Sequence, residues 1–182
     1  MNKFIILDRD GVINHDSDEY IKSPAEWHPI PGSLEAIARL KQAGYQIAVA
    51  TNQSGVARGL YDEKILGLIH QKMQDLLAKL NASIDVIFYC PHQPSDHCTC
   101  RKPKPGLLQQ VAKHFNISLT SIYYIGDKKS DVDAAHAAGC KAILVKTGYG
   151  EQTIQKYPEL DVPIFNNLAE VADAILKGSL ND

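Results

Sequence analysis

The stretch FIILDRDGVIN (Phe4–Asn14) places two carboxylates directly after a short apolar run. The run predicts a strand over Phe4–Leu7, so Asp8 and Asp10 follow at the point where that strand ends. Two like charges two residues apart repel one another unless a positive group offsets them. We therefore expect a cation to be held beside Asp8 and Asp10.

Short β-branched runs alternate with amphipathic segments along the whole chain. Strands are predicted over Phe4–Leu7, Gln46–Ala50, Val86–Tyr89, Ile122–Ile125, Ala142–Val145 and Ile164–Phe165. Helices are predicted over Ser33–Ala43, Asp62–Leu80, Leu107–Phe115, Asp131–Ala138 and Leu168–Leu176. Ser33 is expected to cap the first helix and Gly44 to end it. The alternation predicts an α/β fold, a Rossmann-like doubly wound parallel sheet in one domain spanning 1–182.

Composition and charge exclude several classes of protein. The chain of 182 residues has a formal net charge of −2 and no basic tract, which argues against binding to bulk nucleic acid. The run before Asp8 is too short for a signal peptide or a membrane span, so we expect a cytoplasmic protein with no membrane partner. Because no heptad or large apolar stripe is present, we expect a monomer.

Polar residues also follow the other predicted strands. The segments concerned are Thr51-Asn52-Gln53-Ser54-Gly55, Arg101-Lys102-Pro103 and Gly126-Asp127-Lys128-Lys129-Ser130-Asp131. In a parallel sheet the carboxyl ends of the strands meet at one edge, where ligands bind. A single Asp-x-Asp or Gly-Asp is more often a turn or a helix cap, but four such elements in order predict one shared site.

Carboxylates that converge from two strands form an oxygen-rich site of the kind that Mg²⁺ prefers. Asp8, Asp10 and Asp127 are the predicted ligands, and Asp131 is expected to support them from the first turn of its helix. The cation would offset the repulsion between the first two carboxylates. The predicted cofactor is therefore Mg²⁺.

The same residues suit metal-assisted phosphoryl transfer. Asp8 would attack phosphorus and form an aspartyl-phosphate. Asp10 would protonate the leaving oxygen and then deprotonate the attacking water. Thr51 and Lys102 would hold the phosphoryl oxygens while negative charge spreads over them. These four residues are the predicted catalytic set.

A cluster of thiols and imidazoles lies just past the third predicted strand. Its members are Cys90, His92, Cys98 and Cys100, which lie within a span of eleven positions. Three thiolates and one imidazole suit a closed, structural Zn²⁺ site, with His97 as a possible substitute ligand. The alternative is a set of buried thiols with a surface histidine. Cys140, beside Gly139, is expected to be a core thiol.

The motifs DRDG, TNQSG, the lysine of RKP and GDKKSD together resemble those of the haloacid dehalogenase-like (HAD) phosphohydrolases. The combination DRDGVIN, TNQSGVARG, CPH…CTCRKP and GDK is similar to the D-glycero-D-manno-heptose-1,7-bisphosphate 7-phosphatase family. The resemblance covers nearly the whole chain. It implies a minimal cap, a zinc-bound loop and a sugar bisphosphate as substrate in the synthesis of lipopolysaccharide precursors.

The resemblance also implies substrate contacts and the same catalytic roles for the aspartates. The implied contacts are Asp16 and nearby residues up to Tyr20, together with Asn52, Gln53, Ser54, Arg101 and Lys128. Arg101 and Lys128 suit a second, non-reacting phosphate, since both are cations that pair with anionic oxygens. The loop HDSDEY (His15–Tyr20) matches the family loosely, because it brings three acids near a dianionic substrate.

Four other functions remain open on sequence grounds. A histidinol-phosphate phosphatase would use the same scaffold and chemistry. A polynucleotide 3′-phosphatase would need a basic stripe, which the sequence lacks. A receiver-like signalling domain also gathers Asp, Thr and Lys on an α/β sheet but has no need of the cysteine loop. A zinc-dependent binding module leaves the acid pair unexplained.

Overall fold

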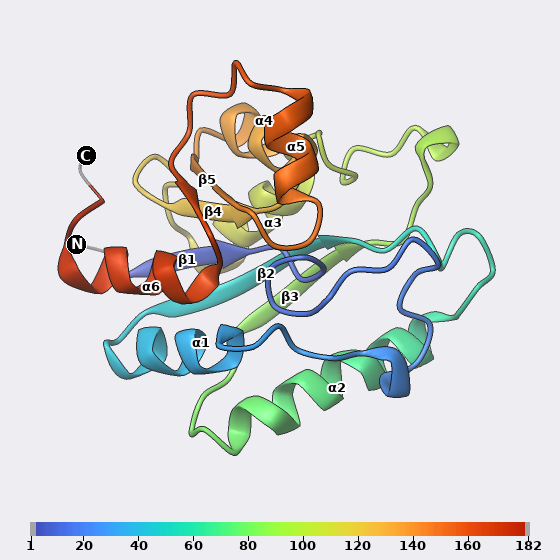
Figure 1. Cartoon of the computed structure of the whole chain (residues 1–182). Helices are drawn as coiled ribbons and strands as arrows, with labels where there is room; N and C mark the ends of the chain where they lie inside the picture. Colours follow the sequence, from blue (N-terminus) through green and yellow to red (C-terminus); the bar gives the residue numbers. More distant parts are fainter. Residues whose placement is uncertain (1–2, 181–182) are drawn as a thin grey trace.

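Six parallel strands form the centre of the molecule (Figure 1). The computed structural model describes residues 3–180, so the two ends of the predicted domain lie outside the described residues. The strands are β1 (Phe4–Leu7), β2 (Gln46–Asn52), β3 (Val86–Cys90), β4 (Tyr123–Gly126), β5 (Lys141–Val145) and β6 (Ile164–Phe165). They pair in the order β3-β2-β1-β4-β5-β6, which confirms the predicted doubly wound sheet.

Helices cover both faces of this sheet (Figure 1). The α-helices are α1 (Ser33–Gln42), α2 (Glu63–Ala78), α3 (Gly106–Phe115), α4 (Lys129–Ala138), α5 (Gly150–Lys156) and α6 (Leu168–Lys177). Helices α1, α2 and α6 lie on one face, and α3, α4 and α5 lie on the other. Two 3₁₀ turns, η1 (Pro24–Glu26) and η2 (Pro94–Asp96), lie in connecting loops.

Strand β1 shows why the sheet needs cover on both faces. Ile5 and Leu7 pack into the core formed with α1, α2 and α6, whereas Phe4 and Ile6 pack into the core with α3 and α4. Successive side chains of a strand point to opposite faces, so an apolar run with no alternation is buried on both sides. The segment between β2 and β3 contains only α2, which packs on the sheet, in agreement with a minimal cap.

The boundaries differ from the predicted ones in a few places. Ser33 is the first residue of α1 and not its cap, since Gly32 holds that position and the Ser33 hydroxyl donates to the carbonyl of Val12. Helix α4 begins at Lys129, two residues before the predicted start. Helix α5 was not predicted, because seven residues give too short a periodic pattern.

The order of the sheet reverses between β1 and β4, the two central strands. Chain connections run outward from β1 through β2 to β3, and from β4 through β5 to β6. At such a switch point the loops after the two strands diverge and leave a crevice at the carboxyl edge. Asp8 and Asp127 are the first residues after β1 and β4, so the fold brings them to this crevice.

No helix among residues 3–180 is both long enough and apolar enough to cross a membrane.

Candidate active site and metal sites

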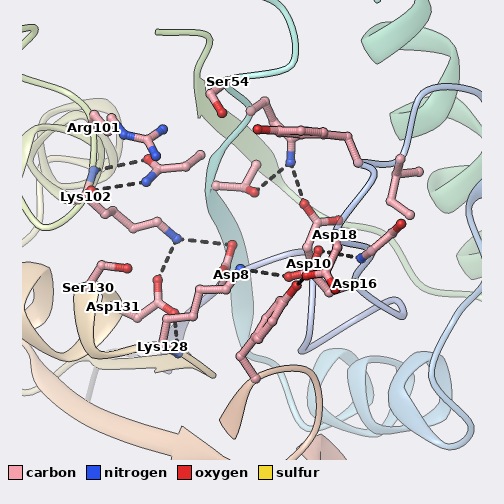
Figure 2. Close-up of a pocket in the computed structure, with 17 residues that line it drawn as sticks. Asp8, Asp10, Asp16, Asp18, Ser54, Arg101, Lys102, Lys128, Ser130 and Asp131 are labelled. Carbon is pink, nitrogen blue, oxygen red and sulfur yellow. Dashed lines mark hydrogen bonds and ion pairs between the residues drawn. The ribbon is translucent and has the colours of Figure 1, made fainter. Parts of the chain in front are cut away.

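A cavity of about 420 Å³ opens at the carboxyl edge of the sheet. Figure 2 shows its lining, which comes from the end of β2, from the loops after β1, β2, β4 and β5, and from the segment that follows β3. All of the predicted catalytic and substrate-binding residues line it, namely Asp8, Asp10, Asp16, Tyr20, Thr51, Asn52, Gln53, Ser54, Arg101, Lys102 and Lys128. The rule that strand ends share one site therefore located the cavity correctly.

Asp8 and Lys102 form an ion pair on the floor of this cavity. The Lys102 ammonium lies 3.1 Å from Asp8 Oδ1 and 2.7 Å from Asp131 Oδ1 (Figure 2). It also lies 2.6 Å from the hydroxyl of Tyr124. All four side chains are buried. A buried ammonium needs such partners, because an unpaired charge away from water is costly.

The charges on this floor do not balance. Burial raises the pKa of Asp8 to about 6, although Lys102 acts in the opposite direction. Burial, and after it the neighbouring Asp131, raises the pKa of Asp127 well above its usual range. Burial alone would lower the pKa of Lys102, but Asp131 and Asp8 raise it. Asp8, Asp127 and Asp131 share the ammonium of Lys102 and the more distant ammonium of Lys128, which is itself paired with Asp16. The carboxylates outnumber the ammoniums, an arrangement that favours a further cation.

Asp127 is the residue whose surroundings fit a metal ion best. Oxygens of Asp8, Asp127 and Asp131 lie within 4.8 Å of one another. Asp127 Oδ1 is buried and has no hydrogen-bond partner among residues 3–180, whereas Oδ2 accepts from the backbone N–H of Tyr149 at 2.8 Å. Gly11 (φ +82°) lies so close that a Cβ there would be 2.2 Å from Asp127 Oδ2. Carboxylate oxygens with an unused buried acceptor suit Mg²⁺.

The Asp10 carboxylate is engaged elsewhere. Its Oδ1 accepts hydrogen bonds from Arg9 Nη2 at 2.8 Å and from Asn14 Nδ2 at 2.9 Å, and its Oδ2 accepts from Gln53 Nε2 at 2.8 Å. Burial would raise its pKa, but Arg9 and these hydrogen bonds outweigh burial and lower it. The group of carboxylates that could hold a metal ion consists of Asp8, Asp127 and Asp131. A ligand role for Asp10 stays a prediction.

The residues at the carboxyl end of β2 are held by hydrogen bonds to neighbouring segments. The hydroxyl of Thr51 accepts a hydrogen bond from Gln53 Nε2 at 3.0 Å, which leaves its own proton to be donated. Asn52 uses both ends of its amide on the backbone of Lys102: Nδ2 donates to the carbonyl at 3.2 Å, and Oδ1 accepts from the N–H at 3.1 Å. The end of β2 thereby fixes the backbone that carries the lysine.

A second cationic region lies at the rim of the cavity. Lys128 pairs with Asp16 at 2.7 Å and lies 4.7 Å from the ring centre of Tyr149. Burial would lower the pKa of Lys128, but Asp127 and Asp16 raise it, so the side chain stays charged. Arg101 lines the cavity from the segment after β3, and its Nη1 donates to the carbonyl of His92 at 3.2 Å.

Several lining residues were not among the predicted contacts. They are Ile21, Ser130 and Tyr149, whereas Ser17 and Asp18 fall within the implied range from Asp16 to Tyr20. Tyr149 follows β5, so the rule that located the other four segments would also have found it. Its hydroxyl donates to Asp18 in the loop after β1. No local signal in the sequence marks that pairing.

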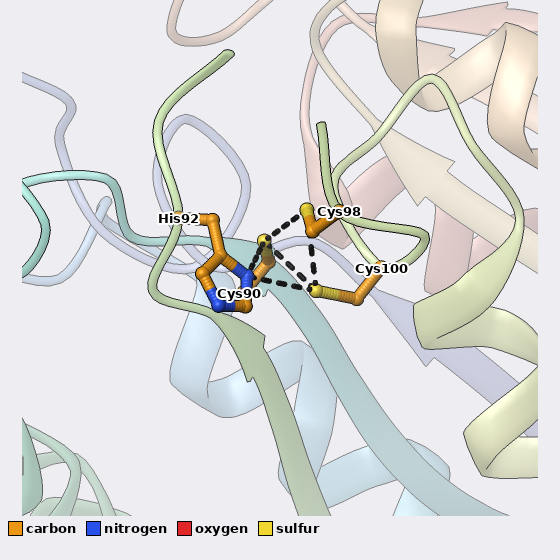
Figure 3. Close-up of side chains that lie close together, drawn as sticks. All are labelled: Cys90, His92, Cys98 and Cys100. Atoms are coloured by element: carbon orange, nitrogen blue, oxygen red, sulfur yellow. Dashed lines mark hydrogen bonds between the residues drawn. The ribbon is translucent and has the colours of Figure 1, made fainter. Parts of the chain in front are cut away.

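The predicted zinc ligands form one compact group (Figure 3). Cys100 Sγ lies 3.1 Å from Cys90 Sγ and 3.6 Å from Cys98 Sγ, and His92 Nδ1 lies 3.3 Å from Cys100 Sγ. Tetrahedral Zn²⁺ with Zn–S bonds of about 2.3 Å separates its sulfur ligands by roughly 3.8 Å. The group therefore has the donor set and nearly the spacing of a closed zinc site.

The other cysteine and histidine predictions can be placed as well. His97 lies outside the four-residue group, whose imidazole comes from His92. Cys140 is buried in the core with α3 and α4, as predicted, and burial raises its pKa to about 12. All four cysteines are free thiols.

The loop around the four zinc-ligand candidates also supports the cavity wall. The backbone N–H of Arg101 donates to Cys98 Sγ at 3.3 Å. The Lys104 ammonium donates to the carbonyl of Cys98 at 2.5 Å. Arg101 and Lys102 therefore lie between the cysteine group and the cavity. The position of their side chains in the cavity wall depends on how well the cysteine loop is ordered.

Comparison with known proteins identifies the family. A hydrolase family model described as HAD-hydrolase-like matches residues 99–171. The chain is 52% identical, over 95% of its length and 97% of the relative's, to a D-glycero-β-D-manno-heptose-1,7-bisphosphate 7-phosphatase of Pseudomonas aeruginosa. It is 49% identical, over 96% of its length and 99% of the relative's, to the protein of the same name from Pseudomonas putida.

A solved structure agrees with these relatives. The crystal structure of D,D-heptose 1,7-bisphosphate phosphatase from Bordetella bronchiseptica, complexed with magnesium and phosphate, superposes with a TM-score of 0.94. The two sequences are 47% identical, and the match covers 97% of this chain and 99% of the other. The chain therefore belongs to the heptose-1,7-bisphosphate 7-phosphatase family of HAD-like hydrolases.

Proposed function

We propose that this protein hydrolyses the 7-phosphate of D-glycero-β-D-manno-heptose 1,7-bisphosphate and releases inorganic phosphate and the 1-phosphate. The observation that carries the proposal is the buried Asp8, held 3.1 Å from Lys102 on the floor of a cavity with Lys128 at its rim. The relatives named above supply the substrate and its β-anomer. The product is a precursor of lipopolysaccharide or a related nucleotide-activated heptose.

Mg²⁺ is the proposed catalytic cofactor. Asp8 and Asp127 would hold it, with Asp131 beside them and Asp10 as a further candidate, and the buried Oδ1 of Asp127 supports this assignment. Bound there, the ion would neutralise charge on the phosphoryl group and on the carboxylates. The Bordetella bronchiseptica structure, titled as a complex with magnesium and phosphate, supports the same metal.

In the first step Asp8 is the nucleophile. One of its carboxylate oxygens forms a bond to phosphorus, and the bond from phosphorus to the C7 oxygen breaks with its electron pair left on that oxygen. Asp10 gives the proton that this oxygen takes up. Thr51 and Lys102 donate to the phosphoryl oxygens, where negative charge is spread in the transition state.

The lowered pKa of Asp10 sets a condition on this step. Asp10 is ionised before substrate binds, because Arg9 and two amides favour the charged form. The dianionic phosphoryl group would raise the pKa of the nearby Asp10 carboxylate by repulsion, which favours uptake of a proton from water as the substrate binds. Asp10 then has a proton to give at the moment when the leaving oxygen needs one.

The second step releases phosphate. Water attacks the phosphorus of the aspartyl-phosphate, the bond from phosphorus to the Asp8 oxygen breaks, and the Asp8 carboxylate is restored. Asp10, now ionised, takes the proton from the attacking water. One carboxyl group thereby serves as acid and then as base, which a residue held in one position can do.

The non-reacting 1-phosphate is bound at the rim. Lys128 and Arg101 supply the two cations that pair with its oxygens, and Tyr149 and Ser130 lie beside them in the cavity lining. In the structure the Lys128 ammonium lies 2.7 Å from Asp16, so the 1-phosphate would replace Asp16 as the partner of Lys128. Tyr20 and the residues Asn52, Gln53 and Ser54 are proposed to contact the substrate between the two phosphates.

Zn²⁺ is the proposed structural metal, held by Cys90, His92, Cys98 and Cys100. Four protein ligands leave no open position, so this ion takes no part in the chemistry. The zinc loop instead orders the segment that carries Arg101 and Lys102. Three thiolate ligands require a reducing compartment, which supports a cytoplasmic location. We further infer that the chain acts as a single domain and a monomer, with no nucleic-acid partner.

Among the other functions, histidinol-phosphate phosphatase is the second candidate, because the same floor of Asp8, Lys102 and Thr51 would serve it. A monophosphate would bring no second anion to Lys128 and Arg101 at the rim, and Lys128 would keep only Asp16 as its partner. This difference favours the bisphosphate. A 3′-phosphatase and a receiver-like domain have no observation in their favour.

Phosphate release from a panel of substrates tests the proposal. The panel contains both anomers of the heptose bisphosphate, histidinol phosphate and a 3′-phosphorylated oligonucleotide, each with Mg²⁺ and with EDTA. We expect the largest kcat/KM for the β-anomer, and only with Mg²⁺. A larger kcat/KM for histidinol phosphate would replace the proposed substrate, and undiminished turnover in EDTA would remove the metal.

A further inference from the structure

Arg9 lies between Asp8 and Asp10 in the chain, and its side chain is fully buried. Its Nε and Nη2 donate to Asp10 Oδ1 at 3.1 Å and 2.8 Å, and its Nη1 lies 3.1 Å from Nε2 of His70. A guanidinium away from water needs partners for its donors. Asp10 satisfies one edge of the group, and His70 satisfies the terminal nitrogen on the other.

His70 reaches this position from α2, a helix that contributes nothing to the lining of the cavity. Only 8% of His70 is exposed, and burial, assisted by Arg9, lowers the pKa of its imidazole to about 3. The ring is therefore neutral and has one acceptor nitrogen. Because Nη1 of Arg9 can only donate, Nε2 is the acceptor and Nδ1 carries the proton.

Gln53 completes the arrangement from the other side. Its Oε1 accepts from Arg9 Nη2 at 3.2 Å and from the hydroxyl of Tyr61 at 2.7 Å, while its Nε2 donates to Asp10 Oδ2 at 2.8 Å. Gly55 leaves room for Tyr61, since a Cβ at Gly55 would lie 2.2 Å from the tyrosine ring. Both oxygens of the Asp10 carboxylate are thereby held in defined directions.

We propose that His70 is a positioning residue, which acts through Arg9 to keep the Asp10 carboxylate oriented for proton transfer. The inference rests on the proposed function, in which Asp10 is acid and then base. His70 itself contacts neither the cavity nor the reacting atoms. Without an acceptor at Nε2, Arg9 Nη1 is buried and unpaired, so the guanidinium turns toward another acceptor and moves the carboxylate with it.

The leaving group distinguishes this role from a merely structural one. The heptose oxygen leaves as an alkoxide unless Asp10 protonates it, whereas the 4-nitrophenolate of 4-nitrophenyl phosphate leaves without a proton. The ratio kcat/KM includes only the steps up to alcohol release, so slow hydrolysis of the aspartyl-phosphate does not hide the effect. A misplaced acid therefore lowers kcat/KM for the sugar phosphate and spares the aryl phosphate.

For His70→Leu we expect kcat/KM on the heptose bisphosphate to fall about ten- to hundredfold, as for a small misplacement of a catalytic group. On 4-nitrophenyl phosphate it should change by less than about threefold. Asp10→Asn provides the reference for complete loss of the acid and should show the same selectivity with a larger fall. Met73→Leu, one turn further along α2 in the core, should leave both substrates unaffected.

Rescue by shape provides a second, independent readout. His70→Gln places an amide oxygen close to the former Nε2 and should restore kcat/KM on the heptose bisphosphate to within about threefold of the parent. His70→Asn places its oxygen near the former Nδ1, away from Arg9, and should behave like His70→Leu. If the leucine variant does not fold, the comparison of the glutamine and asparagine variants decides the question alone.

Three results would overturn the inference. They are an equal fall on both substrates, as a reduced folded fraction produces, no fall on either, and equal activity of the glutamine and asparagine variants. Failure of the proposed function is a separate outcome, because it appears in the parent protein as absent turnover of the heptose bisphosphate. The comparison is then made with whichever alkyl phosphate the parent hydrolyses fastest.

Discussion

The ammonium of Lys102 lies 3.1 Å from Oδ1 of Asp8, and both side chains are nearly inaccessible to water. In such surroundings a charge is stable only beside its partner. The pair therefore places a nucleophile and a group that binds phosphoryl oxygens at one point before any substrate arrives. Asn52 secures this point, since its amide holds the backbone of Lys102 from both sides.

Asp8→Asn should reduce phosphate release by at least about 10⁴-fold, the size of loss seen when a nucleophile is removed. The amide cannot attack phosphorus. Lys102 keeps Asp131 as its partner at 2.7 Å, so we expect the variant to fold. Phosphate release and near-ultraviolet circular dichroism measure the two effects. Activity within tenfold of the parent would remove Asp8 as the nucleophile.

The route through an aspartyl-phosphate has a stereochemical consequence. Two in-line displacements at phosphorus restore the original configuration, whereas direct attack by water inverts it. With a substrate whose transferred phosphoryl group is made chiral by oxygen isotopes and sulfur, we expect overall retention. Inversion would show that Asp8 does not carry the phosphoryl group, even if Asp8→Asn is inactive.

Loss of the proposed zinc should act through the loop that holds Arg101. Cys98→Ser should bind less zinc and lower kcat/KM by up to about 10²-fold, because Arg101 and Lys102 lose their support. Cys140→Ala is the control, since that thiol lies in the core away from the zinc-ligand group. Metal analysis and hydrogen exchange of the loop measure the outcome. Full activity in zinc-free protein would reject the structural role.

Lys128 should select a substrate with two phosphates. Lys128→Met removes a charge-assisted contact to the 1-phosphate, so KM for the bisphosphate should rise about ten- to hundredfold. KM for heptose 7-phosphate should change little. Lys129→Met is the matched control, because Lys129 pairs with Asp133 on the outside of α4. An equal rise of KM for both substrates would place Lys128 at the reacting phosphate instead.

His70 predicts a pH dependence of stability. Its pKa is about 3 in the folded protein and 6.5 in an unperturbed histidine. Below pH 6.5 the unfolded chain binds a proton at His70 that the folded protein does not bind. The contribution of His70 to the free energy of unfolding is therefore at its maximum above pH 6.5. It decreases toward pH 3 by up to about 1.4 kcal/mol per pH unit.

Urea unfolding of the parent and of His70→Gln at several pH values isolates this contribution, because all other groups are common to the two proteins. We expect the stability of the parent relative to the variant to decrease as the pH falls from 6.5 to 4. Parallel curves would show that His70 titrates alike in the folded and unfolded states.

The residues at strand ends were predictable for a reason that is local and general. A buried parallel strand reads as an apolar run, and the polar residues that follow it must lie at the carboxyl edge. This rule predicted that Asp8, Thr51, Lys102 and Asp127 lie at one edge of the sheet, and it would have predicted Tyr149 there also. The cysteine group was found by donor type and spacing alone.

His70 shows what such rules do not reach. It lies in the middle of α2, where the amphipathic pattern predicts which positions are buried but not which side chain each of them contacts. Its contact with Arg9 joins residues 61 positions apart. Only the packing of α2 against the sheet brings its ring to that guanidinium.

The sequence by itself determined the order of the strands and of every helix except α5, the polar segments at the strand ends and the donor set of the cysteine loop. Periodicity and residue chemistry are properties of neighbouring positions, so these features can be predicted without the fold. The tertiary structure decided the partners of each charge. It turned Asp10 toward Arg9, placed Asp131 beside Asp8 and Asp127, and paired Lys128 with Asp16. Such pairings depend on distances between elements, and burial then determines how strongly the charges act on one another.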